Sequence, residues 1–227
     1  MYIEKGDIMR VAIFDFDGTL YKQETFQLMM DHLKKHPQYH IYYGQFFRSI
    51  LPRFIAYKLK LYPESRMKER SMQIYMNALR QLSKQEISNY FAEIAEIMQQ
   101  GFNEKVVEKF RKHQKDNVYT MLVSGAFTTL LELAVEKYPF DQIIGTVIPF
   151  NGQSLTDSKT IYHIQGERKT EKIYQALNDQ SIDWENSYAY GDSYSDLPVL
   201  QMVGHPIAVQ PDKRLYNIAK QNNWQIL

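Results

Sequence analysis

The chain contains no cysteine in its 227 residues. This absence excludes disulfides, thiol nucleophiles and metal sites built on cysteine. It also fits a reducing compartment, where disulfides are rare. Catalytic or metal-binding chemistry in this chain must therefore come from carboxylates, hydroxyls, amines and imidazoles.

The sequence also lacks an apolar stretch long enough to span a bilayer. Its first residues, MYIEKGDIMR, lack the apolar centre of a secretory signal. Neither sign of charge is in excess, because the formal net charge is +1. The overall charge therefore gives no indication of a nucleic-acid or acidic partner. We expect a cytoplasmic protein that contacts neither nucleic acid nor membrane, and the sequence does not indicate its oligomeric state.

The beginning of the chain has one unusual feature. The segment MRVAIFDFDGTL would be a natural start, yet eight residues precede its Met9. The residues Lys5, Gly6 and Asp7 could be encoded by a purine-rich stretch that resembles a ribosome-binding site. Our hypothesis is that translation begins at Met9.

From about residue 103 onward, strand-like and helix-like segments alternate. Short runs rich in β-formers predict strands at 117–125, 142–148, 187–190, 206–209 and 224–227. Apolar residues at helical spacing predict helices at 127–138, 167–177 and 212–221, and another near Pro198. Continuously apolar strands that alternate with helices favour a parallel sheet covered on both faces. We therefore predict an α/β fold with a Rossmann-like parallel sheet.

Residues 20–102 differ from the rest because nearly all of their patterns are helical. The predicted helices cover 24–36, 44–62, 65–82 and 83–101, with Pro52 as a break or kink in the second. Ser83 and Glu86 have the spacing of a capping box, and Gly101 can end the last helix. A helical insert after the first strand would lie over the strand ends. We predict a core domain of residues 1–19 and 103–227 and a helical cap domain of residues 20–102.

Polar residues follow several of the apolar strands, where ligands bind in open α/β sheets. These residues are Asp15, Asp17, Ser124, Gly125, Asp192 and Asp196. Lys169 lies in the first turn of a predicted helix, where a cation is unfavourable unless an anion lies opposite. The three aspartates Asp15, Asp17 and Asp192 cannot all stay ionised side by side without a cation. Mg²⁺ suits them because it prefers hard oxygen ligands.

The remaining polar groups suit an anion with several oxygens. Lys169 and Ser124 could donate to a phosphoryl group. A carboxylate can attack phosphorus and form an aspartyl-phosphate. A second carboxylate can protonate the leaving oxygen and later activate water. The pair Asp15 and Asp17 could fill these two roles, with Gly18 allowing the tight backbone turn between them.

Four segments resemble, in order, the motifs of the haloacid dehalogenase (HAD) superfamily. They are DFDGTL, LVSGAF, the lysine of GERKTEKI and GDSYSDLP. The resemblance extends over the whole chain, and the helical insert resembles the first type of cap in that superfamily. The VSGAF form and the helical cap are most similar to the phosphoserine-phosphatase-type branch. The resemblance implies a Mg²⁺-dependent phosphomonoesterase that acts on a small-molecule phosphate ester.

The resemblance also implies roles for individual residues. Asp15 matches the nucleophile and a Mg²⁺ ligand, and Asp17 matches the general acid/base, whose backbone carbonyl also binds Mg²⁺. Asp192 matches a further Mg²⁺ ligand. The residues that match supporting roles are Ser124, Gly125 and Lys169, which hold phosphate, and Asp196, which orients Lys169 or a metal-bound water.

Residues of the helical insert would select the substrate. Glu24 stands where the phosphoserine-phosphatase branch has a glutamate that meets the substrate amine. Arg66 and Arg70 could meet a substrate carboxylate, although a solvated helix face is the alternative for all three residues. Gly18 departs from that branch, in which serine is common at the matching position. This departure weakens phosphoserine as the specific substrate, so the expected substrate is phosphoserine or a related metabolite.

The segment IYYGQFFRSILPRFIAYKLKLY mixes aromatic, aliphatic and basic residues. Such a segment can contact lipid or admit a long apolar phosphate ester. It is more often the core of a helical domain whose basic side chains reach solvent, and this is what we expect here. The histidines at positions 32, 36, 40, 113, 163 and 205 show no metal-ligand spacing, so we expect surface or core positions for them.

Other functions use similar residues. The first alternative is a phosphotransferase or mutase that acts on sugar phosphates, because it would use the same two aspartates. The second is a catalytically silent module that binds phosphorylated ligands, although such relatives usually lose the nucleophile or the metal aspartate. Taken singly, the motif residues could also belong to turns and helix caps. Lys172 is the alternative to Lys169 as the lysine that matches the motif.

Overall fold

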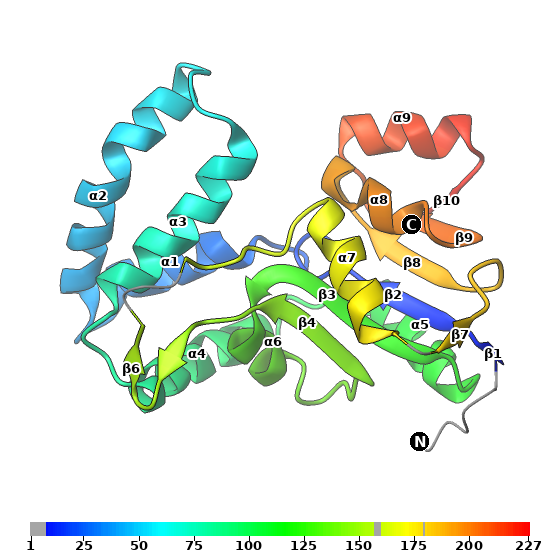
Figure 1. The fold of residues 1–227 in the computed structure, drawn as a ribbon, viewed down its shortest axis with the longest axis horizontal. Coiled ribbons are helices and arrows are strands. Elements are labelled where there is room, and N and C mark those ends of the chain that lie inside the picture. Colours follow the sequence, from blue (N-terminus) through cyan, green and yellow to red (C-terminus); the bar gives the residue numbers. More distant parts are fainter. Residues whose placement is uncertain (1–7, 157–159, 179) are drawn as a thin grey trace.

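The computed structural model places a six-stranded parallel sheet at the centre of the fold, in the order β10-β9-β8-β2-β3-β4 (Figure 1). It describes residues 8–156, 160–178 and 180–227, so residues 1–7, on which the Met9 hypothesis depends, lie outside the described residues. The strands are β2 (Val11–Phe14), β3 (Tyr119–Phe127), β4 (Gln142–Thr146), β8 (Tyr188–Gly191), β9 (His205–Ala208) and β10 (Gln225–Ile226). The predicted parallel sheet is therefore confirmed.

The sheet is covered on both faces because its central strands are apolar throughout. In β2 every residue is buried, and successive side chains point to opposite faces. Ala12 and Phe14 join one apolar core, while Val11 and Ile13 join another. The first core contains residues of α5 (Glu104–Lys115) and α6 (Thr128–Ala134). The second contains residues of α7 (Glu167–Ala176), α8 (Leu197–Leu200) and α9 (Lys213–Gln221).

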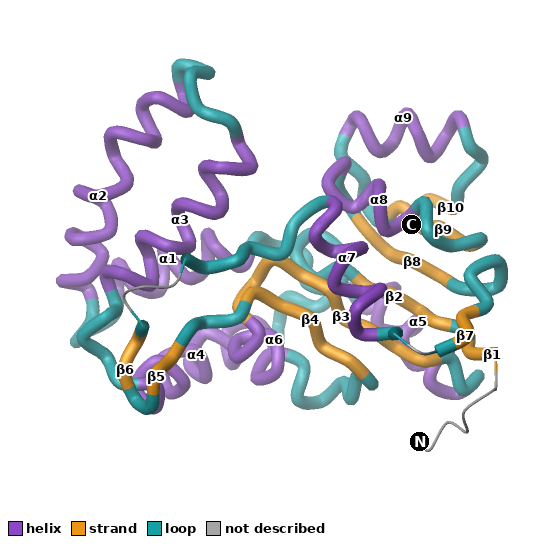
Figure 2. Tube along the Cα trace, in the orientation of Figure 1, coloured by secondary structure: helices purple, strands orange, loops and turns teal. Residues whose placement is uncertain are grey.

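Four helices connect β2 to α5 (Figure 2). They are α1 (Thr25–Lys35), α2 (His40–Lys58), α3 (Glu64–Ala78) and α4 (Lys84–Met98). The helix α2 continues through Pro52, so this proline does not divide the helix. In Figure 1 α2 and α3 form a hairpin that projects from the body of the molecule. By contrast, α4 packs on α6, and the ring of Phe91 stacks on that of Phe127 with centroids 5.8 Å apart.

Several elements were not predicted from the sequence. They are α5, the parallel pair β1 (Ile8–Met9) and β7 (Ser181–Ile182), the hairpin of β5 (Phe150–Asn151) and β6 (Ser154–Leu155), and the short 3₁₀ helix η1 (Tyr194–Asp196). Strands of two residues carry no periodicity that could reveal them. For α5 the sequence does carry a signal, since Val106, Val107 and Phe110 lie at helical spacing and are buried.

The predicted capping box at the start of α4 is present. The Ser83 hydroxyl accepts a hydrogen bond from the Glu86 backbone N–H at 3.2 Å, and the Glu86 carboxylate accepts one from the Ser83 backbone N–H at 2.7 Å. These bonds satisfy two N–H groups that the helix itself leaves without partners. Because α4 packs on α6, this cap stabilises the contact between the helical insert and the sheet.

We expect Ser83→Ala to lower the free energy of unfolding by about 1 kcal/mol, because the helix loses its side-chain cap. Urea unfolding followed by circular dichroism measures this change. Ser49→Ala is a matched control, since Ser49 is exposed within α2 and its hydroxyl donates only to the Gln45 carbonyl at 2.9 Å. An equal effect of the two substitutions would show that the cap adds nothing.

Candidate active site

A cavity of about 380 Å³ opens at the carboxyl ends of β2, β3 and β8. The residues that line it include most of those singled out in the sequence. From the strand ends and their neighbours they are Asp15, Asp17, Ser124, Gly125, Lys169, Asp192 and Asp196. Helices α1, α2 and α3 contribute the opposite wall. The parallel sheet brings these residues together because all its strands end at the same edge.

A buried lysine links two of the carboxylates. The Nζ atom of Lys169 lies 2.5 Å from Oδ1 of Asp15 and 2.7 Å from Oδ1 of Asp196. Burial alone would lower the pKa of Lys169, but the charges of Asp15 and Asp196 outweigh it and raise that pKa above its usual value. The lysine therefore stays charged and the two carboxylates are held beside it.

The carboxylates outnumber the cation that faces them. One oxygen from each of Asp15, Asp192 and Asp196 lies within 4.8 Å of the others. Burial, followed by the charge of Asp196, raises the pKa of Asp15 well above its usual range and that of Asp192 to about 7. For all of these carboxylates to be ionised together, a further cation must balance their charge. Their hard oxygens suit a divalent ion such as Mg²⁺.

The carboxylate of Asp17 points to the first helix of the insert. It accepts a hydrogen bond from the Thr25 backbone N–H at 2.9 Å and another from the Thr25 hydroxyl. Burial raises the pKa of Asp17 to about 7, although the bonds from Thr25 oppose the shift. At neutral pH this carboxyl group can therefore both give and accept a proton.

Two glycines allow close approaches within the site. Gly18 has φ of +73°, a conformation that favours glycine, and a Cβ there would collide with the Asp192 carboxylate. A Cβ at Gly125 would collide with the ring of His163. The Ser124 hydroxyl beside it is buried and accepts the Ala126 backbone N–H at 3.1 Å. The strand β3 has a register irregularity between Val123 and Phe127, which places Ser124 and Gly125 at the cavity.

The remaining predicted residues lie in different places. Glu24 lines the cavity, and its negative charge contributes to the raised pKa values of Asp17 and Asp192. Arg70 and Arg66 are not among the residues that line the cavity within the described part of the chain. The candidate contact for a substrate amine is thus at the cavity, whereas the candidate contacts for a carboxylate are not.

Sequence reasoning missed several residues of the cavity, and two of them contact the predicted site residues. His163 is buried against Gly125, and burial lowers its pKa to about 4, so its imidazole is neutral at physiological pH. Thr25 holds Asp17, as described above. His163 precedes Lys169 by six residues without a recognisable motif, and Thr25 reads in the sequence as an ordinary residue at a helix start. The spacing of residues in the sequence therefore does not indicate that either residue lies at the cavity.

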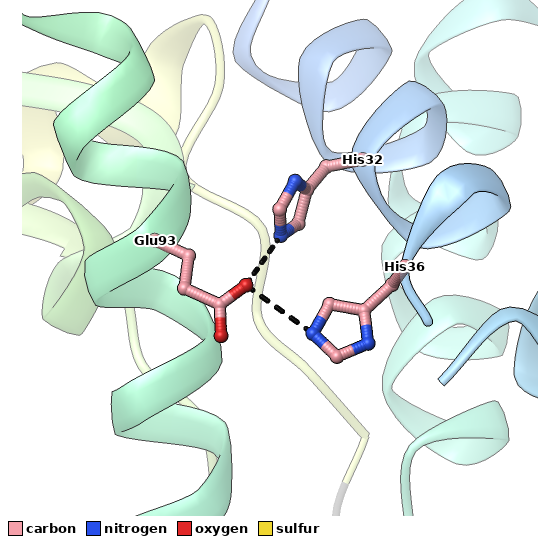
Figure 3. A group of neighbouring side chains, drawn as sticks. All are labelled: His32, His36 and Glu93. Carbon is pink, nitrogen blue, oxygen red and sulfur yellow. Dashed lines mark hydrogen bonds and ion pairs between the residues drawn. The ribbon is translucent and has the colours of Figure 1, made fainter. Parts of the chain in front are cut away.

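A second cluster outside the cavity joins α1 to α4 (Figure 3). The Nε2 atoms of His32 and His36 lie 3.0 and 3.2 Å from the same oxygen of Glu93. His36 Nδ1 accepts the backbone N–H groups of Gln38 and Tyr39 at 3.1 and 3.0 Å. The proton of the neutral ring is then on Nε2, which donates to Glu93, so this nitrogen has no free lone pair for a metal. The cluster therefore acts as a hydrogen-bonded link between the two helices.

The fold and the strand-end carboxylates define a class of α/β hydrolases, and the comparison of families agrees. The family model for haloacid dehalogenase-like hydrolases matches residues 12–201. This match covers most of the chain, so the protein belongs to that family. The resemblance noted in the sequence is thereby confirmed.

Two curated proteins illustrate the similarity. An inhibition of morphological differentiation protein of Streptomyces azureus is 26% identical over 158 residues, which are 69% of this chain and 57% of that protein. A histidinol-phosphatase of Neisseria meningitidis serogroup C is 25% identical over 165 residues, which are 69% of this chain and 72% of that protein. The chain thus matches little more than half the length of the Streptomyces relative.

Solved structures show the same architecture. A Bordetella pertussis Tohama I protein of unknown function has a TM-score of 0.80 at 20% identity, with 97% of this chain and 99% of that chain covered. A phosphoserine phosphatase with a phospho-aspartyl intermediate analogue has a TM-score of 0.63 at 18% identity, with 97% and 93% covered. At such identities the likeness shows the fold alone, and it confirms the predicted Rossmann-like sheet with a helical insert.

The raised pKa values of about 7 for Asp17 and Asp192 predict how the metal-free protein responds to pH. Between about pH 4 and about pH 7 the folded protein keeps protons that the unfolded chain has released, so the free energy of unfolding falls as pH rises. We expect Asp192→Asn to reduce this slope in urea unfolding with EDTA. The exposed Asp31→Asn is the control, and an unchanged slope in Asp192→Asn would contradict the assignment.

Proposed function

We propose that this protein is a Mg²⁺-dependent phosphatase that hydrolyses a small-molecule phosphomonoester through an aspartyl-phosphate intermediate. The observation that carries the proposal is the grouping of Asp15, Lys169 and Asp192 around one cavity at the strand ends. Membership of the haloacid dehalogenase-like hydrolases supports the same chemistry. We also propose a cytoplasmic location, which the absence of cysteine supports.

The residues fit a divalent metal ion. In this proposal the carboxylates of Asp15 and Asp192 and the backbone carbonyl of Asp17 hold Mg²⁺. The fit is supported by the crowding of carboxylate oxygens within 4.8 Å, which a single lysine does not neutralise. When bound, the ion would neutralise charge on the phosphoryl oxygens.

The reaction would proceed in two steps. In the first, an oxygen of Asp15 attacks phosphorus, the bond from phosphorus to the ester oxygen breaks, and Asp17 gives its proton to that oxygen. In the second, Asp17 takes a proton from water, whose oxygen attacks phosphorus and displaces the Asp15 carboxylate. The pKa of about 7 for Asp17 suits both transfers, because the group can be present in either form at neutral pH.

The other strand-end residues would hold the transferred group. The charge of Lys169, the hydroxyl of Ser124 and the backbone N–H of Gly125 are proposed donors to the phosphoryl oxygens. The contact of Asp196 with Lys169 at 2.7 Å supports a positioning role for Asp196. The Thr25 hydrogen bonds would likewise position Asp17.

We propose that residues 20–102 form the cap and that residues 1–19 and 103–227 form the core. The cap would select the leaving group, because α1, α2 and α3 supply one wall of the cavity. Glu24 is the proposed contact for a substrate amine. Phosphoserine and related amino-alcohol phosphates fit this contact, and similarity to a histidinol-phosphatase supports this range.

We expect the protein to release phosphate from at least one ester in a panel of phosphoserine, phosphoethanolamine, sugar phosphates, nucleotides, a lysolipid phosphate and p-nitrophenyl phosphate. Chelation by EDTA should abolish turnover, and Mg²⁺ should restore it. Asp15→Asn should lower kcat by at least about a thousandfold, because an amide cannot serve as the nucleophile. Asp31→Asn is the matched control. Full activity in Asp15→Asn, or no turnover of any ester, would refute the proposal.

Replacing Glu24 should discriminate between substrates. We expect Glu24→Gln to raise KM for amine-bearing esters by about tenfold, because a charge-assisted hydrogen bond is lost. The KM for p-nitrophenyl phosphate, which has no amine, should stay the same. Steady-state kinetics with both substrates at one pH removes any common effect of Glu24 on the ionisation of Asp17. An equal change in both KM values would argue against an amine contact.

A further inference from the structure

The helix α2 carries both buried and exposed apolar side chains. Its inner side, formed by Tyr42, Phe46 and Ile50, is buried in the main apolar core. Outside this buried side Phe47, Leu51, Phe54, Ile55 and the C-cap residue Leu59 are between 37% and 64% exposed, and we call these five residues the outer face of α2. The sequence led us to expect a helix of the cap core, and only the inner side meets that expectation.

The residues of the outer face recur every three or four positions, so they form one continuous stripe along the helix. In Figure 1 α2 lies at the edge of the molecule farthest from the sheet. Leu61, just beyond the helix, is 77% exposed and extends the stripe to the tip of the hairpin. A contiguous apolar surface of this kind indicates a binding surface.

The chain segment that carries this stripe has charge of one sign. Residues 32–63 contain no aspartate or glutamate, although the whole chain has a net charge of only +1. The basic residues of this segment are Lys34, Lys35, Arg48, Arg53, Lys58 and Lys60. In the described part of the chain none of them forms an ion pair with a carboxylate.

The basic side chains nearest the stripe lie along the helix itself. Arg48 and Arg53 donate to the carbonyls of Gly44 and Ser49, one turn earlier, at 3.2 and 3.3 Å. The ammonium group of Lys58 lies 5.3 Å from the centre of the Phe54 ring. Arg48 and Lys58 are exposed, so their cations are available to groups outside the protein, whereas Arg53 is half-buried.

We propose that the outer face of α2 docks on the surface of an anionic lipid bilayer. Apolar side chains of a surface helix enter the boundary between headgroups and acyl chains, while the basic residues contact lipid phosphates. No helix among the described residues is long and apolar enough to cross a membrane, so the contact is with the surface. This inference replaces the expectation, drawn from the sequence alone, that the protein does not contact membranes.

The charge of this segment favours an anionic bilayer over a second copy of the chain as the binding partner of the outer face. A symmetric dimer through the outer face would bring two segments without acidic residues against each other, and like charges would oppose the contact. A bilayer rich in phosphatidylglycerol supplies both the opposite charge and the apolar layer. Tyr57, on the same helix, lines the cavity, so docking would bring the candidate active site close to the membrane surface.

The test is flotation of the full chain with vesicles of phosphatidylglycerol and phosphatidylcholine, and with vesicles of phosphatidylcholine alone. We expect binding to the anionic vesicles only, and weaker binding at high salt. Phe54→Ser with Ile55→Ser should weaken binding by at least about tenfold, because two inserted side chains are lost. The double variant Ile97→Ser with Val147→Ser, also at exposed apolar positions (48% and 68%), is the matched control and should bind as the wild type does.

A second double variant tests the contribution of the basic residues separately from that of the apolar outer face. Arg48→Glu with Lys58→Glu should weaken binding by at least about fivefold for each cation lost. Circular dichroism and thermal unfolding should show that both α2 variants remain folded, since the replaced side chains are exposed or pack only along the helix. The test does not use phosphatase activity, so it can fail or succeed independently of the proposed function.

Several results would overturn the proposal. One is the absence of wild-type binding to anionic vesicles at low salt, and another is equal binding to neutral vesicles. A dimer in analytical ultracentrifugation that Phe54→Ser with Ile55→Ser dissociates would identify a second copy as the occupant. Loss of vesicle binding in the charge variant but not in the apolar variant would show adsorption to lipid phosphates by charge alone, without entry of the outer face into the bilayer.

Discussion

The charge of Lys169 lies between Asp15 and Asp196, and the arrangement of the site depends on this buried contact. The three residues come from the first helical turn of α7, the end of β2 and the short helix η1, which are far apart in the sequence. Removing one partner from such a buried ion pair typically costs about 3–5 kcal/mol, because a charge is left uncompensated. The lysine therefore joins the strand ends into one site and also holds the residues proposed to react.

The same contact leaves an excess of negative charge. Asp192 adds a third carboxylate that Lys169 does not neutralise, and its pKa is raised to about 7 by burial and by Asp196. The left-handed backbone at Gly18 allows Asp192 to come this close. The metal-free site is thus poised to take up a cation, which is the physical basis of the proposed Mg²⁺ requirement.

Different helices of the insert contact the candidate active site and form the exposed outer face. The start of α1 holds Asp17 through Thr25, and α4 is anchored to α6 and linked to α1 by Glu93 and the two histidines. These contacts attach one part of the insert firmly to the sheet. The hairpin of α2 and α3 projects from that anchored part, with one apolar side packed and the other exposed.

The sequence by itself determined which chemistry-bearing residues follow the strands, the helical insert, the capping box at Ser83 and the family. These features depend on local patterns of a few residues, which a sequence displays directly. Only the tertiary structure decided that Asp17 bonds to Thr25, that His163 packs on Gly125 and that Arg70 does not line the cavity. It also decided which side of α2 is exposed, because apolar residues lie on more than one side of this helix and so do not reveal which side is buried.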